Sequence, residues 1–184
     1  MRKNNKKSKK SNNDYNWIIK ITVLAFLISL IFSLVSETTL PNVGLITGIV
    51  IVFVFIIIGV LFDMIGVSVT SSDESKFHSM GARKVRGAKT AVALKKNAEK
   101  VSSFCNDVIG DICGIISGSA GVVIASKLAS SLNISTFYMS LIVTAIIAAL
   151  TIGGKALGKG LAINKGNNIL YAFAKVISIF KSEK

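Results

Sequence analysis

Four apolar segments, each close to the thickness of a bilayer, constrain this chain more than any other feature. A helix needs about 20 mostly apolar residues to cross the hydrocarbon core. The segments are residues 17–35, 43–62, 106–132 and 137–152, and the last is the shortest. A backbone inside a membrane has to satisfy its hydrogen bonds internally. The segments therefore predict an all-α, polytopic membrane protein with about four transmembrane helices.

The charge content supports this class. Charged residues make up 17% of the chain, whereas a soluble domain is nearer a quarter charged. Lys and Arg number 22 and Asp and Glu 9, which gives a net charge of +13. A chain both apolar and basic argues against a soluble enzyme, a disordered protein and a secreted disulfide scaffold. We expect a basic cytoplasmic tail over residues 1–15 and one integral membrane domain over residues 16–184.

The positions of the charges predict the topology. The loop at residues 36–42 has one acid and no base, and residues 130–136 carry no charge. The basic residues gather before the first segment, between the second and third, and after the fourth. With four spans, every basic cluster falls on one side, and cytoplasmic loops carry the excess of Lys and Arg. We expect a multi-pass protein of the cell membrane with both termini in the cytoplasm.

The first apolar segment and the basic tail before it indicate how the N-terminal part of the chain meets the membrane. The first apolar segment is longer than a signal-peptide core and no clear cleavage site follows it, so we interpret it as an uncleaved span. The basic tail predicts attraction to anionic lipid headgroups, at about 1 kcal/mol per charge near the surface. Aromatic residues are not interleaved with its lysines, and we expect no nucleic-acid partner.

Two further helical elements are predicted on the cytoplasmic side. Residues 72–101 are typical of a helical hairpin, in which Ser71 and Glu74 match a capping box and Asn97 ends the second helix. Residues 168–181 are typical of an amphipathic helix. Its apolar stripe consists of Ile169, Phe173, Val176, Ile177 and Phe180. Such a helix either lies in the membrane interface or packs under the bundle.

The third apolar segment carries polar residues that a plain anchor would lack. Gly110, Gly114 and Gly118 recur every four residues and form a small-residue ridge for close helix packing. Asp107 and Asp111 are also four residues apart, broadly on the ridge side, so we expect them to face protein. An acid at the bilayer centre costs about 2.5–3.5 kcal/mol on insertion scales, which favours a role for these two.

Carboxylates beside amide and hydroxyl oxygens suit a hard cation such as Mg²⁺. The candidate ligands are Asp107, Asp111, Asn106 and Ser68. The alternative is an ion pair between these acids and Lys155. Asp63, near the cytoplasmic end of the second segment, is a third membrane acid.

Little else in the chain points to chemistry. Cys105 and Cys113 are eight residues apart in one predicted helix, about 12 Å along its axis, which is too far for a disulfide between them. His78 is the sole histidine. Neither a nucleophile–base pair nor a phosphate-binding loop is visible. We expect no resident cofactor and no enzymatic activity.

The order of these parts resembles the membrane domain of the CNNM/CorB–CorC magnesium transporter family over about residues 43–180. Four stretches carry the resemblance. A helix of the family is matched by Phe77, Met80 and Ala88, and its Asn-Pro-Glu-Arg-Phe turn is similar to residues 97–101. The family motif Gly-Asn-x-x-x-Asn-Ile resembles the stretch with Asn106, Asp107, Asp111 and Ile112. The motif Gly-Glu-x-x-Pro-Lys-x-x-Ala resembles residues 154–162.

The departures from the family pattern fall at polar positions. The family glutamate reads Lys155, the proline reads Gly158, and residues 66–69 lack the glutamate of a Ser-x-Glu-Thr-Ala motif. The family's ATP-binding CBS pair has no counterpart in these 184 residues, so we expect a short form without nucleotide regulation.

The resemblance implies a homodimer that binds or transports a divalent cation, Mg²⁺ or Co²⁺, across the plasma membrane. Two hypotheses stay open. Either Asp107 and Asp111 form a rearranged site, or Lys155 takes the place of the cation. In the second case the chain is a non-transporting relative that acts as a membrane scaffold or regulatory subunit. A small holin-like pore is a third interpretation.

Overall fold

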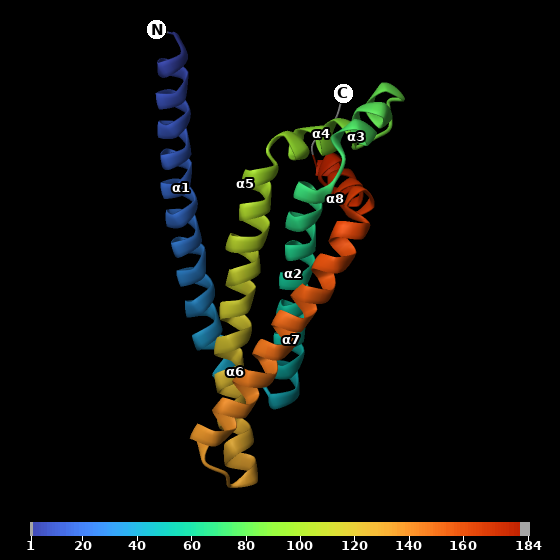
Figure 1. Ribbon diagram of the computed structural model, residues 1–184. Coiled ribbons are helices and arrows are strands. Elements are labelled where there is room, and N and C mark those ends of the chain that lie inside the picture. Colours follow the sequence, from blue (N-terminus) through green and yellow to red (C-terminus); the bar gives the residue numbers. More distant parts are fainter. Residues whose placement is uncertain (1, 181–184) are drawn as a thin grey trace.

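The computed structural model describes the backbone of residues 2–180 and the side chains of residue 15 and residues 17–179. Every element is helical, as predicted (Figure 1). The elements are α1 (Arg2–Thr39), the 3₁₀ turn η1 (Leu40–Asn42), α2 (Leu45–Ser71), α3 (Glu74–Ala82), α4 (Ala88–Lys96), α5 (Ala98–Ser103), the π-helix η2 (Phe104–Gly110), α6 (Asp111–Leu132), α7 (Thr136–Asn164) and α8 (Gly166–Phe180). The predictions for the side chains of the basic tail and for residues 181–184 lie outside the described residues.

Four helical stretches are long and apolar enough to cross a membrane, which confirms the predicted number. They are Trp17–Asn42, Leu45–Ser71, Ala98–Leu132 and Thr136–Asn164. The apolar stretch predicted as the fourth span ends at residue 152, and the helix that contains it is longer. Because Gly, Lys and Ala follow without a proline, α7 runs on to Asn164 and has a total length of 29 residues, about 43 Å. Hydropathy marks where the apolar stretch ends and does not mark where the helix ends.

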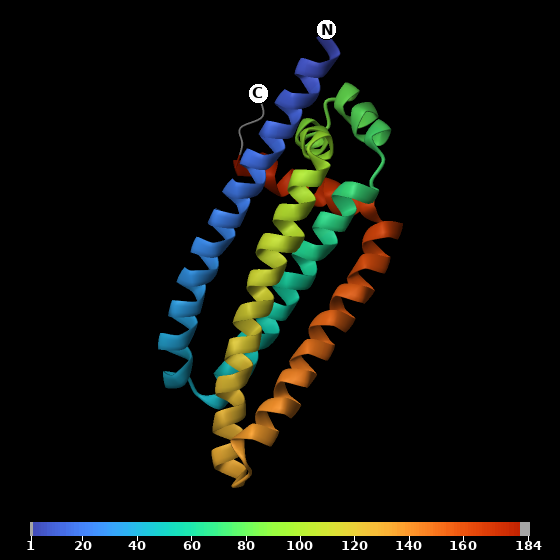
Figure 2. The same ribbon diagram turned by 60° about the vertical axis from the view of Figure 1, so that its left-hand side comes forward.

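Helix α2 is the centre of the bundle and packs against α6 and α7 (Figure 2). Small residues allow the close approach of these helices. A Cβ on Gly121 of α6 would lie 2.4 Å from Ile147 of α7, and one on Gly154 of α7 would lie 2.9 Å from Val60 of α2. Helix α1 packs on the other side of α6, where Ile28 lies against the buried cluster that contains Ile116.

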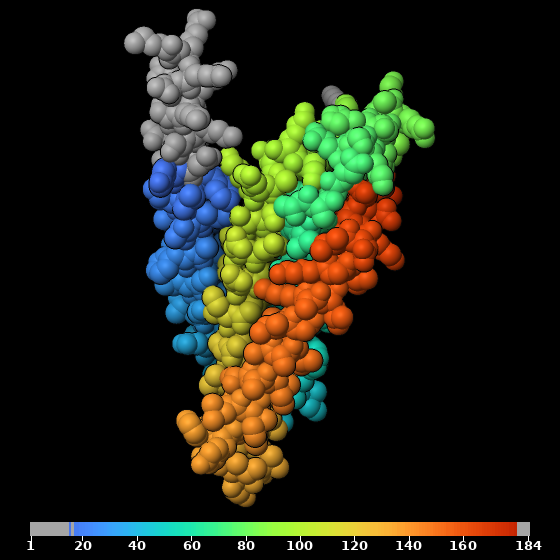
Figure 3. All heavy atoms as spheres, viewed as in Figure 1, coloured from blue at the N-terminus to red at the C-terminus, as the bar shows by residue number. Residues whose placement is uncertain are grey.

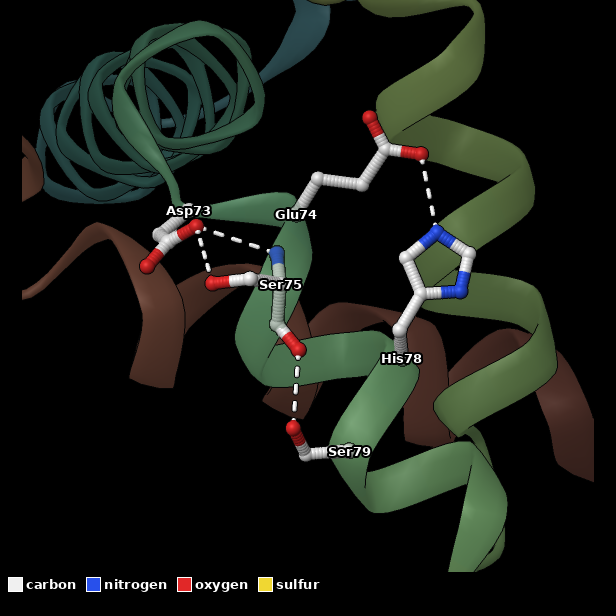
Figure 4. A network of polar contacts seen from close by, with 5 residues as sticks. All are labelled: Asp73, Glu74, Ser75, His78 and Ser79. Carbon is white, nitrogen blue, oxygen red and sulfur yellow. Dashed lines mark hydrogen bonds and ion pairs between the residues drawn. The ribbon is translucent and has the colours of Figure 1, made fainter.

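The helical hairpin α3–α4 lies at the end of the bundle where both chain termini also lie (Figures 1 and 2). The predicted capping box at Ser71 is wrong, because α2 continues through Ser71. Asp73 caps α3 instead. Its carboxylate accepts hydrogen bonds from the backbone N–H of Ser75 at 3.0 Å and from Ser75 Oγ at 2.7 Å (Figure 4). Asn97 ends α4, as predicted.

The cap should make the start of α3 sensitive to pH. The two bonds from Ser75 favour the ionised carboxylate and hold the pKa of Asp73 below its ordinary value. Since the folded-state pKa is the lower one, the cap stabilises α3 above the unfolded-state pKa. That contribution is lost as the pH falls through the folded-state value. We expect Asp73→Ala to speed hydrogen exchange of the first amides of α3 about fivefold.

The control is Ser79→Ala, which removes a bond to the Ser75 carbonyl and leaves the cap intact (Figure 4). Equal exchange rates in the native chain and the Asp73→Ala variant at neutral pH would contradict the assignment.

Helix α8 crosses the bundle beneath the hairpin (Figure 2). Its buried residues are Gly166, Leu170, Ala174 and Ser178, which lie outside the predicted stripe. Val176 and Ile179 stay 53% and 60% exposed. The helix therefore packs under the bundle through one face and presents part of its apolar stripe outward. The side chain of Phe180 is outside the described set.

The α3–α4 hairpin contacts α8 at Gly87. Gly87 has φ +85°, and a Cβ there would lie 3.1 Å from the Cα of Lys175. The backbone of the hairpin approaches α8 too closely for a larger residue without rearrangement.

Candidate cation site

Asp63 is a carboxylate buried in the bundle on the otherwise apolar helix α2. It is 4% exposed, and its Oδ2 has no hydrogen-bond partner among the described residues. Gly59 and Gly66 lie one turn before and one turn after it on the same helix face. A Cβ on Gly59 would lie 3.1 Å from Cys113 and 3.6 Å from the carbonyl oxygen of Gly110. Asp63 is thus on the face of α2 that meets η2 and the start of α6.

Asn106 of η2 faces this part of α2. A Cβ on Gly66 would lie 1.9 Å from Asn106 Oδ1, so the amide fills the space that the absent side chain leaves. Asn106 Nδ2 donates a hydrogen bond to Ser102 Oγ at 3.5 Å. Asn106 Oδ1, like Asp63 Oδ2, is buried and has no partner in the described part of the chain. The unpaired Asn106 oxygen therefore lies against α2 at Gly66, one helical turn after Asp63.

This arrangement is costly unless something binds to it. Burying an acceptor without a donor costs about 1–3 kcal/mol of folding free energy, and burying an unpaired charge costs more. Both oxygens are acceptors, so neither relieves the other. What they require is a proton, a donor group or a cation. The segment that supplies Asn106 is a π-helix, a rare geometry that occurs frequently at functional sites.

Lys155 of α7 brings a positive charge to Gly110, at the end of η2. Its Nζ would lie 3.5 Å from a Cβ on Gly110, the residue that packs against Gly59. It lies 3.7 Å from Asp111 Oδ1, and the two side chains are 22% and 69% exposed. Among the described residues, no ion pair within 4.0 Å joins Lys155 to Asp63. The ammonium therefore lies beside Gly110 and is loosely paired with the exposed carboxylate of Asp111.

The four predicted ligands do not come together. Asp107 and Asp111 are exposed, so the expectation that they face protein within this chain is wrong. Ser68 is fully buried with an unpaired Oγ, yet it lies five residues after Asp63, about 140° around α2. Only Asn106 lies beside the buried acid. The ion pair foreseen between Lys155 and the acids is present with Asp111.

The predicted glycine ridge is only partly a packing surface. Gly110 is buried against α2. A Cβ on Gly114 or on Gly118 would meet nothing within 4 Å. The physical reason is that α6 turns this part of its surface away from the other helices, so Gly114 and Gly118 are not covered in the single chain.

Asp63 was foreseen as a membrane acid but not as the centre of the site. The signal was present on its own helix. Gly59, Asp63 and Gly66 form one row on a segment of bulky apolar residues. A small–acid–small row indicates that the acid faces a close neighbouring helix rather than lipid.

Other reactive side chains do not extend the site. The described residues contain no group of three or more His, Cys, Asp and Glu side chains that could hold a metal. Cys105 and Cys113 are free and buried. His78 lies 3.1 Å from Glu74 on the exposed face of α3 (Figure 4). Any cation at Asp63 would therefore rely on carboxylate, amide, carbonyl and water oxygens, the ligand set of Mg²⁺.

Comparison with protein-family models, curated proteins and solved structures found no match to this chain. The resemblance to the CNNM/CorB–CorC family therefore stays a prediction from the sequence.

Proposed function

We propose that this chain binds a divalent cation, Mg²⁺ or Co²⁺, at Asp63 and Asn106 and moves it across the cell membrane. One observation carries the proposal: the two buried acceptor oxygens, Asp63 Oδ2 and Asn106 Oδ1, on facing helices without a donor. Mg²⁺ is usually held by one or two carboxylates and keeps several waters, so a small set of protein oxygens is sufficient. The family resemblance favours the same function.

Orientation and assembly follow as parts of the proposal. Both termini and the basic hairpin lie at one end of the bundle, and we place that end in the cytoplasm because cytoplasmic loops carry the excess of Lys and Arg. We place a second copy on the uncovered face of α6, where Gly114 and Gly118 permit close helix approach.

A second candidate function has its own observation. The Lys155 ammonium lies beside Gly110, on the part of η2 that packs against Gly59, and supplies a tethered positive charge there. If that charge replaces the cation, the chain does not transport and serves as a membrane scaffold or regulatory subunit. The presence or absence of flux decides between these two functions.

The test is cation flux into proteoliposomes that contain the full chain and a Mg²⁺-sensitive dye. We expect flux from the native chain and a reduction of at least tenfold in Asp63→Asn, because each tenfold loss of affinity needs only about 1.4 kcal/mol. The matched control is the double variant Asp107→Asn/Asp111→Asn, which removes two exposed carboxylates and should keep the flux within about twofold.

Two results would overturn this function. Flux that survives Asp63→Asn would exclude the buried site as its pathway. A folded native chain without flux would favour the scaffold. Thermal unfolding provides a readout independent of transport, since a bound cation at 100 times its Kd adds about 2.7 kcal/mol to the unfolding free energy. That gain should be absent in Asp63→Asn and present in the double variant.

A further inference from the structure

A groove opens between α1 and the rest of the bundle, and neither Asp63 nor Asn106 lines it. Its volume is about 560 Å³, within the range of small-molecule sites. Helix α1 forms one wall, α5 with η2 forms the other, and Phe62 of α2 and Phe173 of α8 contribute to the lining. In Figures 1 and 3, α1 diverges from α5 toward the end of the bundle where the termini lie. Farther along, Ile28 packs on the α6 cluster and closes the groove.

The lining combines an apolar surface with two positive charges. Apart from Lys20 and Lys100, the lining side chains are aliphatic, aromatic or cysteine. Both lysines are exposed, and neither forms an ion pair with an acid whose side chain the structure describes. The ammonium of Lys100 lies 5.9 Å from the ring centroid of Trp17. Tryptophan and lysine are typical of the level at which lipid headgroups lie.

We propose that this groove binds an anionic phospholipid. The acyl chains lie on Phe62, Phe104 and Phe173, and the phosphate lies between Lys20 and Lys100. This site differs from the general attraction of the basic tail to a charged surface, because helices distant in the sequence, among them α1, α2, α5 and α8, build it together. It also goes beyond the proposed transport function and does not depend on it.

The charges favour lipid over a second copy of the chain as the occupant. Each copy carries a net charge of +13, so bringing another copy to a rim of two lysines adds repulsion. The groove is apolar and lies on the side of a bundle whose long helices suit a membrane. An anionic lipid satisfies both features, since it supplies apolar chains together with a negative headgroup.

The chain offers its own probe, because Trp17 lines the groove and is the sole tryptophan. The full chain is reconstituted into phosphatidylcholine vesicles that contain a minor fraction of bromine-labelled lipid, which quenches tryptophan fluorescence on contact. We expect brominated phosphatidylglycerol to quench Trp17 with at least about fivefold preference over brominated phosphatidylcholine, as one lysine–headgroup attraction would give.

The preference should disappear in Lys20→Gln/Lys100→Gln. The matched control is Lys96→Gln/Lys159→Gln, which removes the same charge from exposed lysines outside the groove and should keep the preference. Circular dichroism checks that all variants remain helical. Three outcomes would overturn the proposal: equal quenching by both lipids in the native chain, equal loss of preference in both double variants, or no quenching by either lipid. The last would indicate that protein fills the groove.

Discussion

Replacing Lys155 with glutamine is expected to tighten divalent-cation binding by at least tenfold. Two unit charges 4 Å apart interact by about 4 kcal/mol at an effective dielectric constant of 20. At any given distance the ammonium repels a divalent ion twice as strongly as it repels a monovalent one, so a divalent ion bound at Asp63 would feel this repulsion more strongly. Pairing of Lys155 with Asp111 and its partial exposure reduce this value. A tenfold gain in cation affinity requires relief of only about 1.4 kcal/mol of this repulsion.

The same substitution should have opposite effects on the protein with and without the cation. Without a cation, loss of the ammonium removes the positive charge beside Gly110, and a buried carboxylate with less compensation lowers stability. With a cation, the ion supplies that charge. We therefore expect a lower unfolding free energy in chelator and a larger cation-dependent increase. Lys155→Glu should increase the cation dependence further, since it adds a ligand at the position where the CNNM/CorB–CorC pattern has glutamate.

Lys159→Gln is the matched control, because Lys159 is one turn further along α7 and exposed. The apparent Mg²⁺ affinity, taken from the rise of the melting temperature with Mg²⁺ concentration, should change by less than about twofold in this variant. A Lys155→Gln variant that loses stability equally with and without Mg²⁺ would assign the lysine a structural ion-pair role. That result would also favour the non-transporting scaffold.

The architecture was largely predictable because apolar length and charge sidedness are strong signals. The IVIVFVFIII run in α2 identifies a span without reference to any partner. Helix ends were less predictable. Ser71 and Asp73 are both residue types that can cap the start of α3. Asp73 is the cap because α2 continues through Ser71. The sequence permits α7 to extend past residue 152, and packing supports the extension, since a Cβ on Gly158 would lie 2.7 Å from Met64 of α2.

The site was less predictable than the fold, because burial of a polar residue depends on which helix lies opposite. Asp107, Asp111 and Asp63 all interrupt apolar segments, and their hydropathy alone ranks them alike. The structure buries only Asp63. The difference comes from the neighbours: α2 is enclosed by α6, α7 and η2, whereas the Asp111 surface of α6 is uncovered in the single chain.

Replacing Gly66 with alanine should weaken cation binding by at least tenfold without changing any charge. The new methyl group would lie 1.9 Å from Asn106 Oδ1, so the amide has to move away. Because the obstructing atoms are at the end of a side chain, the backbone can stay in place. Alanine also favours a helix over glycine by about 1 kcal/mol, so the fold should survive. The expected result is a well-folded protein whose cation-dependent rise in melting temperature is reduced.

A double-mutant cycle separates this effect from general damage to the bundle. Asn106→Ala removes the same oxygen directly, so Gly66→Ala should add almost nothing to it if both act on one ligand. Gly153→Ala is the matched control, since a Cβ there meets nothing within 4 Å on a helix of the same bundle. Additive losses from Gly66→Ala and Asn106→Ala would mean that two independent features were disturbed. Asn106 would then not be the ligand that Gly66 makes room for, and Asp63 would have to bind its cation with another partner.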